Sequence, residues 1–489
     1  ASPEAEVHGS SLRLAVDLVP EGLLLLGALL LGILALGRAA RPRPVQLLTV
    51  VVLLAAGGAQ LLSLNGMPDA GYRAYSDGLV VDRYTAFLVP VMCVLALLAV
   101  STSGPLLPRI ATHVAEYHAL VLLAVLGGSL LVAAREMAAR WVALELLSVC
   151  LALLVAMVKT DRRGSEAAVK QLVIGASASA VLLYGFALLY GAGGSTVLVD
   201  VASNVRHGSP AAALGMGLVV CALLTKLGAV PFHQWLPDTL QGAPAPVAAL
   251  TLGVGGTAVA GSLARVVVTT FAELAASWTA LVALVAAASL LYGNLAALTQ
   301  VSLRRLVGLL AVGQAGFLLL GLLGSAPSQK GVAALIFALA TGGVTVVGMF
   351  AVLAAIDGAV GDDLDSLRGL GRRSPLAATM LGLGVVSLVG VPPLIGFFAK
   401  LFLLQSAVLA GYAWLVLLAL VTSVIGAVTA ARLLRLMFVD LPDEGDAAVP
   451  SAGGAVRIAI GFCALATVLL GAAAQPLFTL ASGGAGSIH

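Results

Sequence analysis

The chain has 489 residues, of which 60% are hydrophobic and 10% charged, and its mean hydropathy is +1.08. Such values lie far outside the range of soluble domains and indicate an integral membrane protein. The formal net charge is only +3 and no basic cluster is interleaved with aromatic residues, which argues against a nucleic-acid-binding protein.

The N-terminal segment, ASPEAEVHGSSLRLAVDLVPEGLLLL, is acidic before its first apolar run. A signal peptide has a basic start and a small-residue cleavage site, and neither is present in this segment. We therefore interpret the run from Leu23 onward as the body of a first membrane span.

About fourteen apolar runs are long enough to cross a bilayer, since a span needs roughly 20 apolar residues. The runs are continuous rather than alternating, which argues against a transmembrane barrel. We expect an all-α membrane protein with about 14 transmembrane helices. The predicted spans are 18–38, 44–64, 82–103, 117–134, 138–158, 166–192, 210–230, 244–268, 275–298, 302–324, 330–356, 377–405, 411–438 and 455–481.

The basic residues divide unevenly between the two sides of this arrangement. If the N-terminus lies outside, 16 Lys and Arg residues fall on the inner side and 8 on the outer side. Inner loops of membrane proteins carry the excess of basic residues, so both termini are predicted outside. The eight outer residues are Arg13, Arg73, Arg83, Arg135, Arg140, Arg206, Arg265 and Lys330.

Three ionisable residues, Glu145, Lys226 and Lys400, remain deep inside predicted spans. Each costs about 2.5 to 3.5 kcal/mol at the centre of a bilayer, so such residues face a partner or water and are functional by default. One interpretation is a path for ion transfer. The other is a Glu–Lys pair that pins two helices together without a transport role.

The choice of lysine favours ion transfer. The chain has only five lysines against 21 arginines, and yet both deep cations are lysines. Arginine keeps its proton in proteins, whereas lysine can release one and take it up again. The sequence therefore predicts a path along which protons move.

Both lysines lie beside interruptions of their spans. TKLGAVPFHQW places Lys226 just before Pro231, and LVGVPPLIGFFAKLFLL places Lys400 just after a Gly/Pro interruption made by Gly390, Pro392, Pro393 and Gly396. Proline frees backbone carbonyls, which at membrane depth must face protein or water. Water beside a titratable lysine makes a relay.

The broken spans are the seventh and the twelfth, and an odd shift of five reverses membrane orientation. Interrupted helices at corresponding places indicate inverted repeats. We expect a single membrane domain, 1–489, in which three N-terminal spans (18–116) precede inverted repeats 117–268 and 275–438 and a last span 455–481.

Other polar residues are weaker candidates. His233 and Trp235 lie at a predicted boundary, where Trp is an interface anchor and the histidine is a candidate for proton uptake. Gln314 is the best uncharged polar residue within a span, either as a water ligand or as a tie between helices. His118 and Glu21 are interpreted as boundary residues.

Four stretches of the sequence are similar to a known family: TKLGAVPFHQWLPDTLQGAPAPVAAL, WVALELLSVCLALLV, SLRRLVGLLAVGQAGF and DDLDSLRGLGRRSPLAATMLGLGVVSLVGVPPLIGFFAKLFLL. With the fourteen-span layout, they resemble the antiporter-like subunits of bacterial respiratory complex I, the proton-pumping NADH:quinone oxidoreductase. The bacterial N-type subunits are the most similar, and the resemblance covers almost the whole chain.

The resemblance implies that Glu145, Lys226 and Lys400 form a proton relay. The family usually has a lysine or histidine in the eighth span, where this sequence has Gly256, and a histidine in the tenth, where it has Gln314. Either the centre of the relay then runs through water with one of four polar residues, Thr251, Thr257, Ser262 or Gln314, or this subunit pumps poorly.

The resemblance also implies that NADH oxidation and quinone reduction in other subunits supply the energy. No nucleotide motif and no cysteine set is found, so no cofactor is expected in this chain. The implied partners are neighbouring antiporter-like and small membrane subunits, protons and lipids, in a bacterial plasma membrane. Two alternatives stay open, a subunit of a multi-subunit cation/proton antiporter and a non-pumping scaffold subunit.

Overall fold

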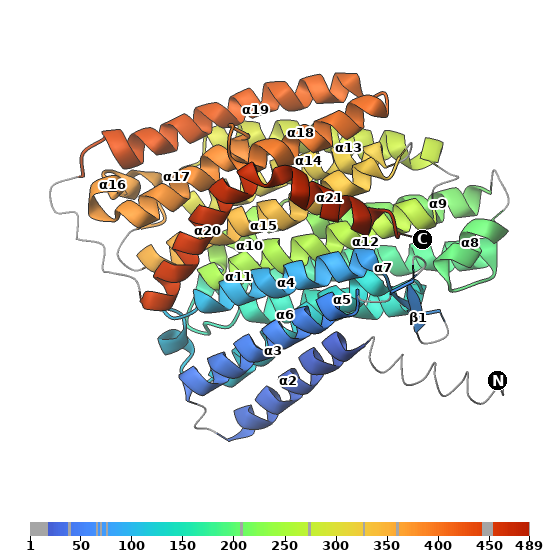
Figure 1. The fold of residues 1–489 in the computed structure, drawn as a ribbon, viewed down its shortest axis with the longest axis horizontal. Helices are drawn as coiled ribbons and strands as arrows, with labels where there is room; N and C mark the ends of the chain where they lie inside the picture. The colour runs from blue at the N-terminus through green and yellow to red at the C-terminus, as the bar shows by residue number, and fades with distance from the viewer. Residues whose placement is uncertain are drawn as a thin grey trace.

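The computed structural model describes residues 18–37, 41–64, 67–68, 71–74, 77–205, 209–271, 275–325, 328–357, 361–442 and 453–488. The expectation for the N-terminal segment therefore lies mostly outside the described residues. The long helices run side by side between two ends of the molecule (Figure 1). One end carries the hairpin of β1 (Tyr72–Ala74) and β2 (Leu79–Val81) and the last described residues, and we call it the C-terminal face.

The N-terminal part consists of three spans and is followed by a first set of five. The three are α2 (Val19–Leu36), α3 (Pro42–Leu62) and α4 (Arg83–Ser101). The set of five comprises α5 (Val114–Ala133), α6 (Met137–Val155), α7 (Arg162–Gly193), the broken pair α9 (Pro210–Leu227) and α10 (Trp235–Gly242), and α11 (Ala245–Leu250) continued by η2 (Thr251–Gly255) and α12 (Gly256–Thr269).

A second set of five follows in the same succession but starts from the opposite end of the molecule. It comprises α13 (Ala275–Leu298), α14 (Leu303–Gly324), α15 (Lys330–Ile356), the broken pair α17 (Pro375–Val389) and α18 (Ile395–Leu409), and α19 (Ala413–Leu434) continued by η4 (Arg435–Val439). The chain ends in α20 (Gly454–Ala472) and α21 (Ala474–Ala485). Short connecting helices are η1 (Leu107–Ile110), α8 (Leu198–Asn204), η3 (Leu364–Leu367) and α16 (Leu370–Arg373).

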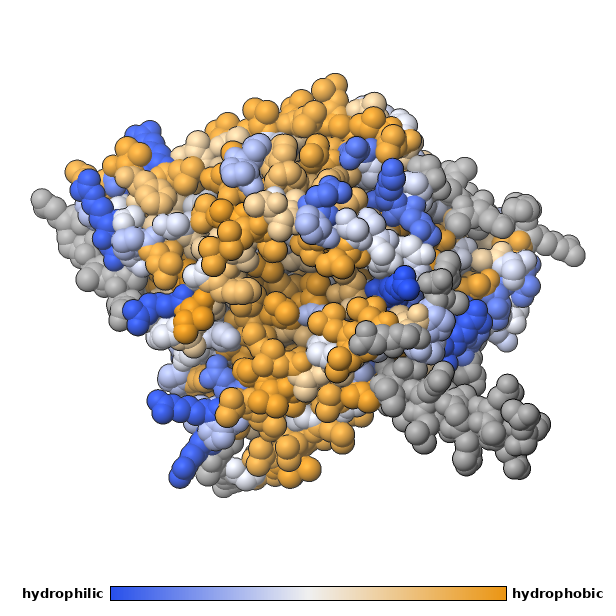
Figure 2. Space-filling model, in the orientation of Figure 1, coloured by the Kyte–Doolittle hydropathy of each residue, from blue (hydrophilic) through white to orange (hydrophobic). Residues whose placement is uncertain are grey.

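The predicted number of spans is confirmed. Among the described residues, 13 helices are long and apolar enough to cross a membrane, and the broken pair α17 and α18 supplies one more crossing. Hydrophobic side chains cover the middle of the molecule, and hydrophilic ones gather toward its two ends (Figure 2). The chain is an integral membrane protein.

Two details differ from prediction. The last predicted run, 455–481, is two helices with a bend at Ala473, and the hairpin of β1 and β2 was not predicted. Gln475 and Pro476 directly follow the bend and are a sequence signal of a break that the predicted run did not take into account. Strands of three residues are too short for alternation to stand out.

Local chemistry explains where several helices begin and end. The Asp82 carboxylate accepts a hydrogen bond of 2.9 Å from the Thr85 N–H, and Thr85 closes the capping box of α4. Pro210 and Pro375 occupy the first positions of α9 and α17, where a missing N–H costs nothing.

An ion pair and hydrogen bonds join the two sets of five at the end opposite the C-terminal face, which we call the ion-pair face. Arg305 Nη1 lies 2.7 Å from Asp238 Oδ1 of α10, and Arg304 Nη1 donates a hydrogen bond of 2.9 Å to the Ala243 carbonyl directly after α10. Gln241 of α10 donates a hydrogen bond of 3.3 Å to Asp362. These contacts hold α10, and with it the first broken helix, against the second set.

Candidate functional site

Glu145 and Lys226 lie side by side, as predicted. Lys226 Nζ, in the last turn of α9, is 3.4 Å from Glu145 Oε1 on α6. It also donates a hydrogen bond of 2.8 Å to Ser148 Oγ, and Ser179 Oγ of α7 donates to the same Glu145 oxygen. The lysine side chain is 7% exposed and that of Glu145 27% exposed. The predicted facing is confirmed, whereas the functional role of the pair stays a prediction.

The helix that carries Lys226 ends immediately after it. Gly228 adopts φ +78°, a left-handed conformation that glycine accepts without a steric cost, and α10 begins only at Trp235. The peptide bond between Val230 and Pro231 is cis. Lys226 therefore lies at the end of an interrupted helix inside the bundle, as the sequence indicates.

Side chains of Trp235 and of another helix form hydrogen bonds with backbone groups at this break. Trp235 Nε1 donates a hydrogen bond of 2.9 Å to the Thr225 carbonyl, and the Val230 N–H donates one of 3.0 Å to Ser289 Oγ of α13. The expectation that Trp235 is an interface anchor was wrong, because its side chain is only 8% exposed and closes the break. A boundary position in sequence did not reveal that α10 folds back into the bundle.

Lys400 has a different environment on α18. Its Nζ donates hydrogen bonds of 3.0 Å to the Val389 carbonyl and 3.3 Å to Ser423 Oγ of α19, and it lies 3.9 Å from the centre of the Phe317 ring. In the part of the chain that the structure describes, no carboxylate forms an ion pair with it. A carbonyl dipole, a hydroxyl and an aromatic face therefore take the place of the counter-ion that Lys226 has.

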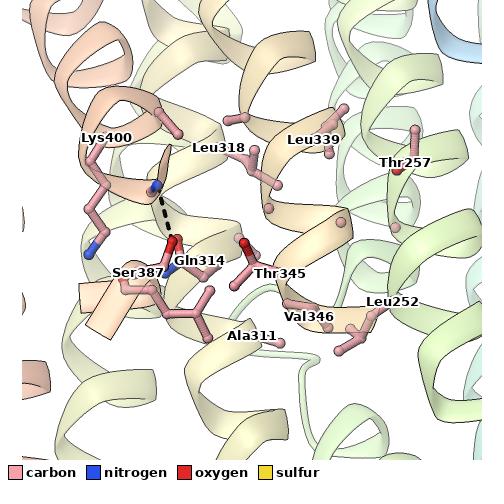
Figure 3. A pocket seen from close by; sticks show the side chains of 18 of the residues that line it. Leu252, Thr257, Ala311, Gln314, Leu318, Leu339, Thr345, Val346, Ser387 and Lys400 are labelled. Carbon is pink, nitrogen blue, oxygen red and sulfur yellow. Dashed lines mark hydrogen bonds between the residues drawn. The ribbon is translucent and has the colours of Figure 1, made fainter. Parts of the chain in front are cut away.

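The second break is held by its own set of polar contacts. Gly390 ends α17 with φ +94°, and Gln314 Nε2 of α14 donates a hydrogen bond of 2.8 Å to the Leu388 carbonyl. The Gly396 N–H donates one of 3.1 Å to Ser387 Oγ, drawn as the dashed line in Figure 3. Of the two interpretations of Gln314, the tie between helices is what these contacts show.

A cavity of about 120 Å³ lies between the two sets of five. Its wall runs from Leu227, next to Lys226, to Lys400 and includes the polar side chains of Thr257, Gln314, Thr345 and Ser387. Several of these side chains are labelled in Figure 3, where the Lys400 nitrogen points away from Gln314 and Thr345. At roughly 30 Å³ per molecule, the cavity has room for about four waters.

A second cavity, of about 40 Å³, lies next to Lys226. It is lined by Lys226, Ser148, Gln171, Thr251 and aliphatic residues of α6, α7 and α12. Thr251 and Thr257, both named as relay candidates, thus lie in the wall of one cavity each. Gly256, between them in sequence, lines the central cavity, and a side chain there would meet nothing within 4 Å of its Cβ.

Two other candidates lie apart from these cavities. His233 lies in the first break with only 6% exposure, and its ring centre is 4.2 Å from that of Tyr292 on α13. Ser262, expected near the centre of the relay, instead accepts a hydrogen bond from Arg140 close to the C-terminal face. The expectation for Ser262 was wrong because one face of α12 turns toward α6 at that level.

The sequence analysis missed a group of buried charges near the C-terminal face. Arg135, Arg140 and Arg265, which were assigned to the outer side, are 7%, 1% and 1% exposed. Arg265 forms a bidentate pair with Asp82, at 2.8 and 2.9 Å. Hydropathy places such residues at span ends, and only the neighbouring helices decide whether a span end is covered.

Two expected boundary residues are also buried. Glu21 is 9% exposed and accepts a hydrogen bond from Ser129 of α5. His118 is fully buried, and its Nδ1 lies 2.8 Å from the Val114 carbonyl. Both residues lie near the starts of their helices, as expected, and only their burial within the bundle was not predicted.

Comparison with known proteins agrees with the resemblance seen in the sequence. A family described as NADH:quinone oxidoreductase/Mrp antiporter, transmembrane, matches residues 134–426. NADH-quinone oxidoreductase subunit N 2 of Acidobacterium capsulatum is 35% identical over 88% of this chain and 91% of its own length. NAD(P)H-quinone oxidoreductase subunit 2 of Synechococcus elongatus is 34% identical over 95% of this chain and 91% of its own length.

Solved structures show the same fold. A chain of respiratory complex I from Thermus thermophilus is 30% identical and superposes with a TM-score of 0.80 over 95% of this chain and 100% of its own. A chain of the Mrp complex from Dietzia superposes with a TM-score of 0.85 over 97% of each chain at 22% identity, which shows the fold alone. The family matches more than half of this chain, and relatives match it along most of their own length, so the chain belongs to the NADH:quinone oxidoreductase/Mrp antiporter family of transmembrane proteins.

Proposed function

We propose that this chain is a proton-translocating subunit of a bacterial NADH:quinone oxidoreductase, in which Glu145, Lys226 and Lys400 carry protons. Protonated Lys226 is held by Glu145 until a change in a neighbouring subunit weakens the pair. Lys226 then releases its proton into the central cavity, from which Lys400 takes it up and delivers it to the outside. Redox chemistry in other subunits supplies the energy.

One observation carries this proposal, the cavity that extends from Leu227 to Lys400. Its size suits a short chain of water molecules, and four hydroxyl or amide side chains along its wall can bind them. Lys400 binds Ser423 and the Val389 carbonyl, so its side chain has to turn about its flexible stem to reach the cavity. That turn separates uptake of the proton from its release.

The proposal includes an orientation and a division of the chain. We assign the C-terminal face to the outside of a bacterial plasma membrane, because basic residues concentrate at the ion-pair face. The burial of Arg135, Arg140 and Arg265 leaves still fewer basic side chains exposed at the C-terminal face. Residues 117–268 and 275–438 act as two inverted transport units, with 18–116 and 455–481 flanking them.

The proposed partners follow from the relatives, which are named as subunits of NADH-quinone or NAD(P)H-quinone oxidoreductases. Neighbouring antiporter-like and small membrane subunits would lie against this chain, and lipid would cover the remaining apolar surface. No redox centre is assigned to this chain, because redox chemistry is proposed for the partners.

The deciding experiment measures NADH-driven proton uptake in inverted membrane vesicles that carry Lys226→Ala. Complex assembly and NADH oxidation are followed in the same samples, and Lys330→Ala, at the exposed start of α15, is the matched control. We expect the assembled Lys226→Ala complex to lose proton uptake together with coupled oxidation. Uptake at the unmutated level would leave the lysine as a structural counter-ion and this subunit as a scaffold.

The same vesicles test the alternative of a cation/proton antiporter. Proton exchange that depends on sodium and needs no NADH would support that function and contradict the proposed coupling to redox chemistry. A sodium gradient imposed without NADH is therefore expected to produce no proton movement.

A further inference from the structure

One buried cation has no place in the proposed relay. Arg140, in the first turn of α6, is 1% exposed, and no carboxylate of the described residues forms an ion pair with it. Its Nη1 donates to Ser262 Oγ and its Nη2 donates to the Ala134 carbonyl, while its Nε has no partner among the described residues. The positive charge is therefore buried without compensation.

The other two buried arginines nearby differ from it. Arg265 is neutralised by Asp82 and lies 4.9 Å from the centre of the Tyr84 ring. Arg135 lies 3.8 Å from Asp77. A fixed charge buried without a counter-ion is costly in a membrane protein, and a neutral amide could make the hydrogen bonds that Arg140 makes. The hydrogen bonds alone do not account for the charge.

Arg140 lies on the same face of α6 as the residues that line the cavity next to Lys226. On α6, Leu147 and Leu151 line the cavity around Lys226, and Arg140 lies on the same helical stripe, seven residues before Leu147. Gly255 of η2 and Val259 of α12 line that cavity, and Ser262 of α12 continues their stripe. Arg140 and Ser262 thus close the seam between α6 and α12 on the side of the C-terminal face.

We propose that Arg140 is an electrostatic barrier that stops protons at Lys226 from leaking along the α6–α12 seam to the C-terminal face. This inference rests on the proposed function, because it assumes that protons reach Lys226. A permanent positive charge in a poorly solvated seam repels protons, as buried arginines do in other selective membrane pores. With this route closed, a proton released by Lys226 is directed toward the central cavity, which leads to Lys400.

A measurement of passive proton leak distinguishes an electrostatic barrier at Arg140 from a purely structural role. The complex is reconstituted in vesicles without NADH, a potassium diffusion potential is imposed, and proton influx is measured with a pH-sensitive dye. Arg140→Gln keeps hydrogen-bond donors but removes the charge, and we expect it to raise passive proton conductance about tenfold. Arg140→Lys keeps the charge, so the passive proton conductance of its vesicles is expected to stay at the unmutated level.

Ser262→Asp is the sharper variant, because it retains Arg140 and adds a carboxylate beside it. If Arg140 only tied helices together, the new ion pair would strengthen the tie and the vesicles would stay tight. A barrier made by charge is instead neutralised, so we expect a leak similar to that of Arg140→Gln. Arg73→Gln, which removes an exposed charge from the same face, is the matched control and is expected to stay tight.

A double variant links the leak to Lys226. Adding Lys226→Met to Arg140→Gln is expected to return conductance to the unmutated level. The inference is overturned if assembled Ser262→Asp and Arg140→Gln complexes stay tight, or if the leak persists without Lys226. NADH-driven uptake in the Lys226→Met single variant is read separately, so a failure of the proposed relay is distinguishable from a failure of the barrier.

Discussion

The two broken helices hold their lysines in opposite ways. Lys226 lies before its break and has a carboxylate at 3.4 Å, whereas Lys400 lies after its break and rests on a carbonyl, a hydroxyl and a phenyl ring. A paired lysine keeps its proton until the partner moves away, while a lysine without a carboxylate gives up its proton more easily. In the proposed relay, this difference assigns different steps to two similar breaks, controlled release to the first and delivery to the second.

The largest expected effect is removal of the second lysine. Lys400→Met leaves an apolar side chain of similar length where the last carrier of the path stands. A positioned proton carrier contributes about 100-fold or more to its step, so NADH-driven proton uptake by the assembled complex is expected to fall by about that factor. Lys330→Met is the control. Proton uptake that survives Lys400→Met would show that Lys400 does not carry protons, so that the two broken helices could not be compared as two steps of one path.

A second change makes the two sites alike. Ser423→Asp places a carboxylate beside Lys400, whose Nζ lies 3.3 Å from Ser423 Oγ. The new pair is expected to hold the proton at Lys400 and slow steady-state uptake about tenfold, which corresponds to about 1.4 kcal/mol in the barrier. Ser423→Ala, measured in parallel, is expected to have little effect. Unchanged uptake in Ser423→Asp would show that a counter-ion does not set the release step.

A third change shortens the gap between the two sites. Gly256 lines the central cavity, and a Cβ added there meets nothing within 4 Å, so Gly256→His is chosen to place a base in the cavity. Uptake is expected to rise about threefold, equivalent to about 0.65 kcal/mol of barrier if transfer across the cavity limits the rate. Gly255→Ala is the control for packing, because its Cβ would lie 2.9 Å from Leu151 Cδ1. A slower Gly256→His complex would argue against transfer through this cavity.

The smallest expected effect concerns the hydrogen bond that closes the first break. Trp235→Phe removes the bond from Nε1 to the Thr225 carbonyl and is expected to lower thermal stability by about 1 kcal/mol. Trp278→Phe removes a similar bond, to the Phe271 carbonyl, away from both lysines. Thermal denaturation of the purified complexes should show similar losses for both. Proton uptake that collapses in Trp235→Phe alone would mean that the shape of the break, and not the lysine alone, controls release.

Much of the candidate site could be predicted from the sequence because its residues are of types that membrane spans rarely contain. Charges and prolines are rare within spans, so Glu145, Lys226, Lys400 and the two interruptions stand out without structural information. The facing of Glu145 and Lys226 also follows, because a buried charge needs a partner. Thr345 and Ser387 could not be found in this way, since hydroxyl residues are common in membrane helices and only their place in the cavity wall distinguishes them.

The sequence by itself determined that this is a membrane protein of about fourteen spans, with two broken helices and three deep ionisable residues. Hydropathy along the chain carries this information, because the cost of placing a residue in a bilayer depends first on its type and depth. Only the tertiary structure decided that Arg140 is buried without a counter-ion among the described residues and that Thr257 and Lys400 share one cavity. Both facts depend on which side of a helix meets which neighbour, and one-dimensional hydropathy does not record the direction in which a side chain points.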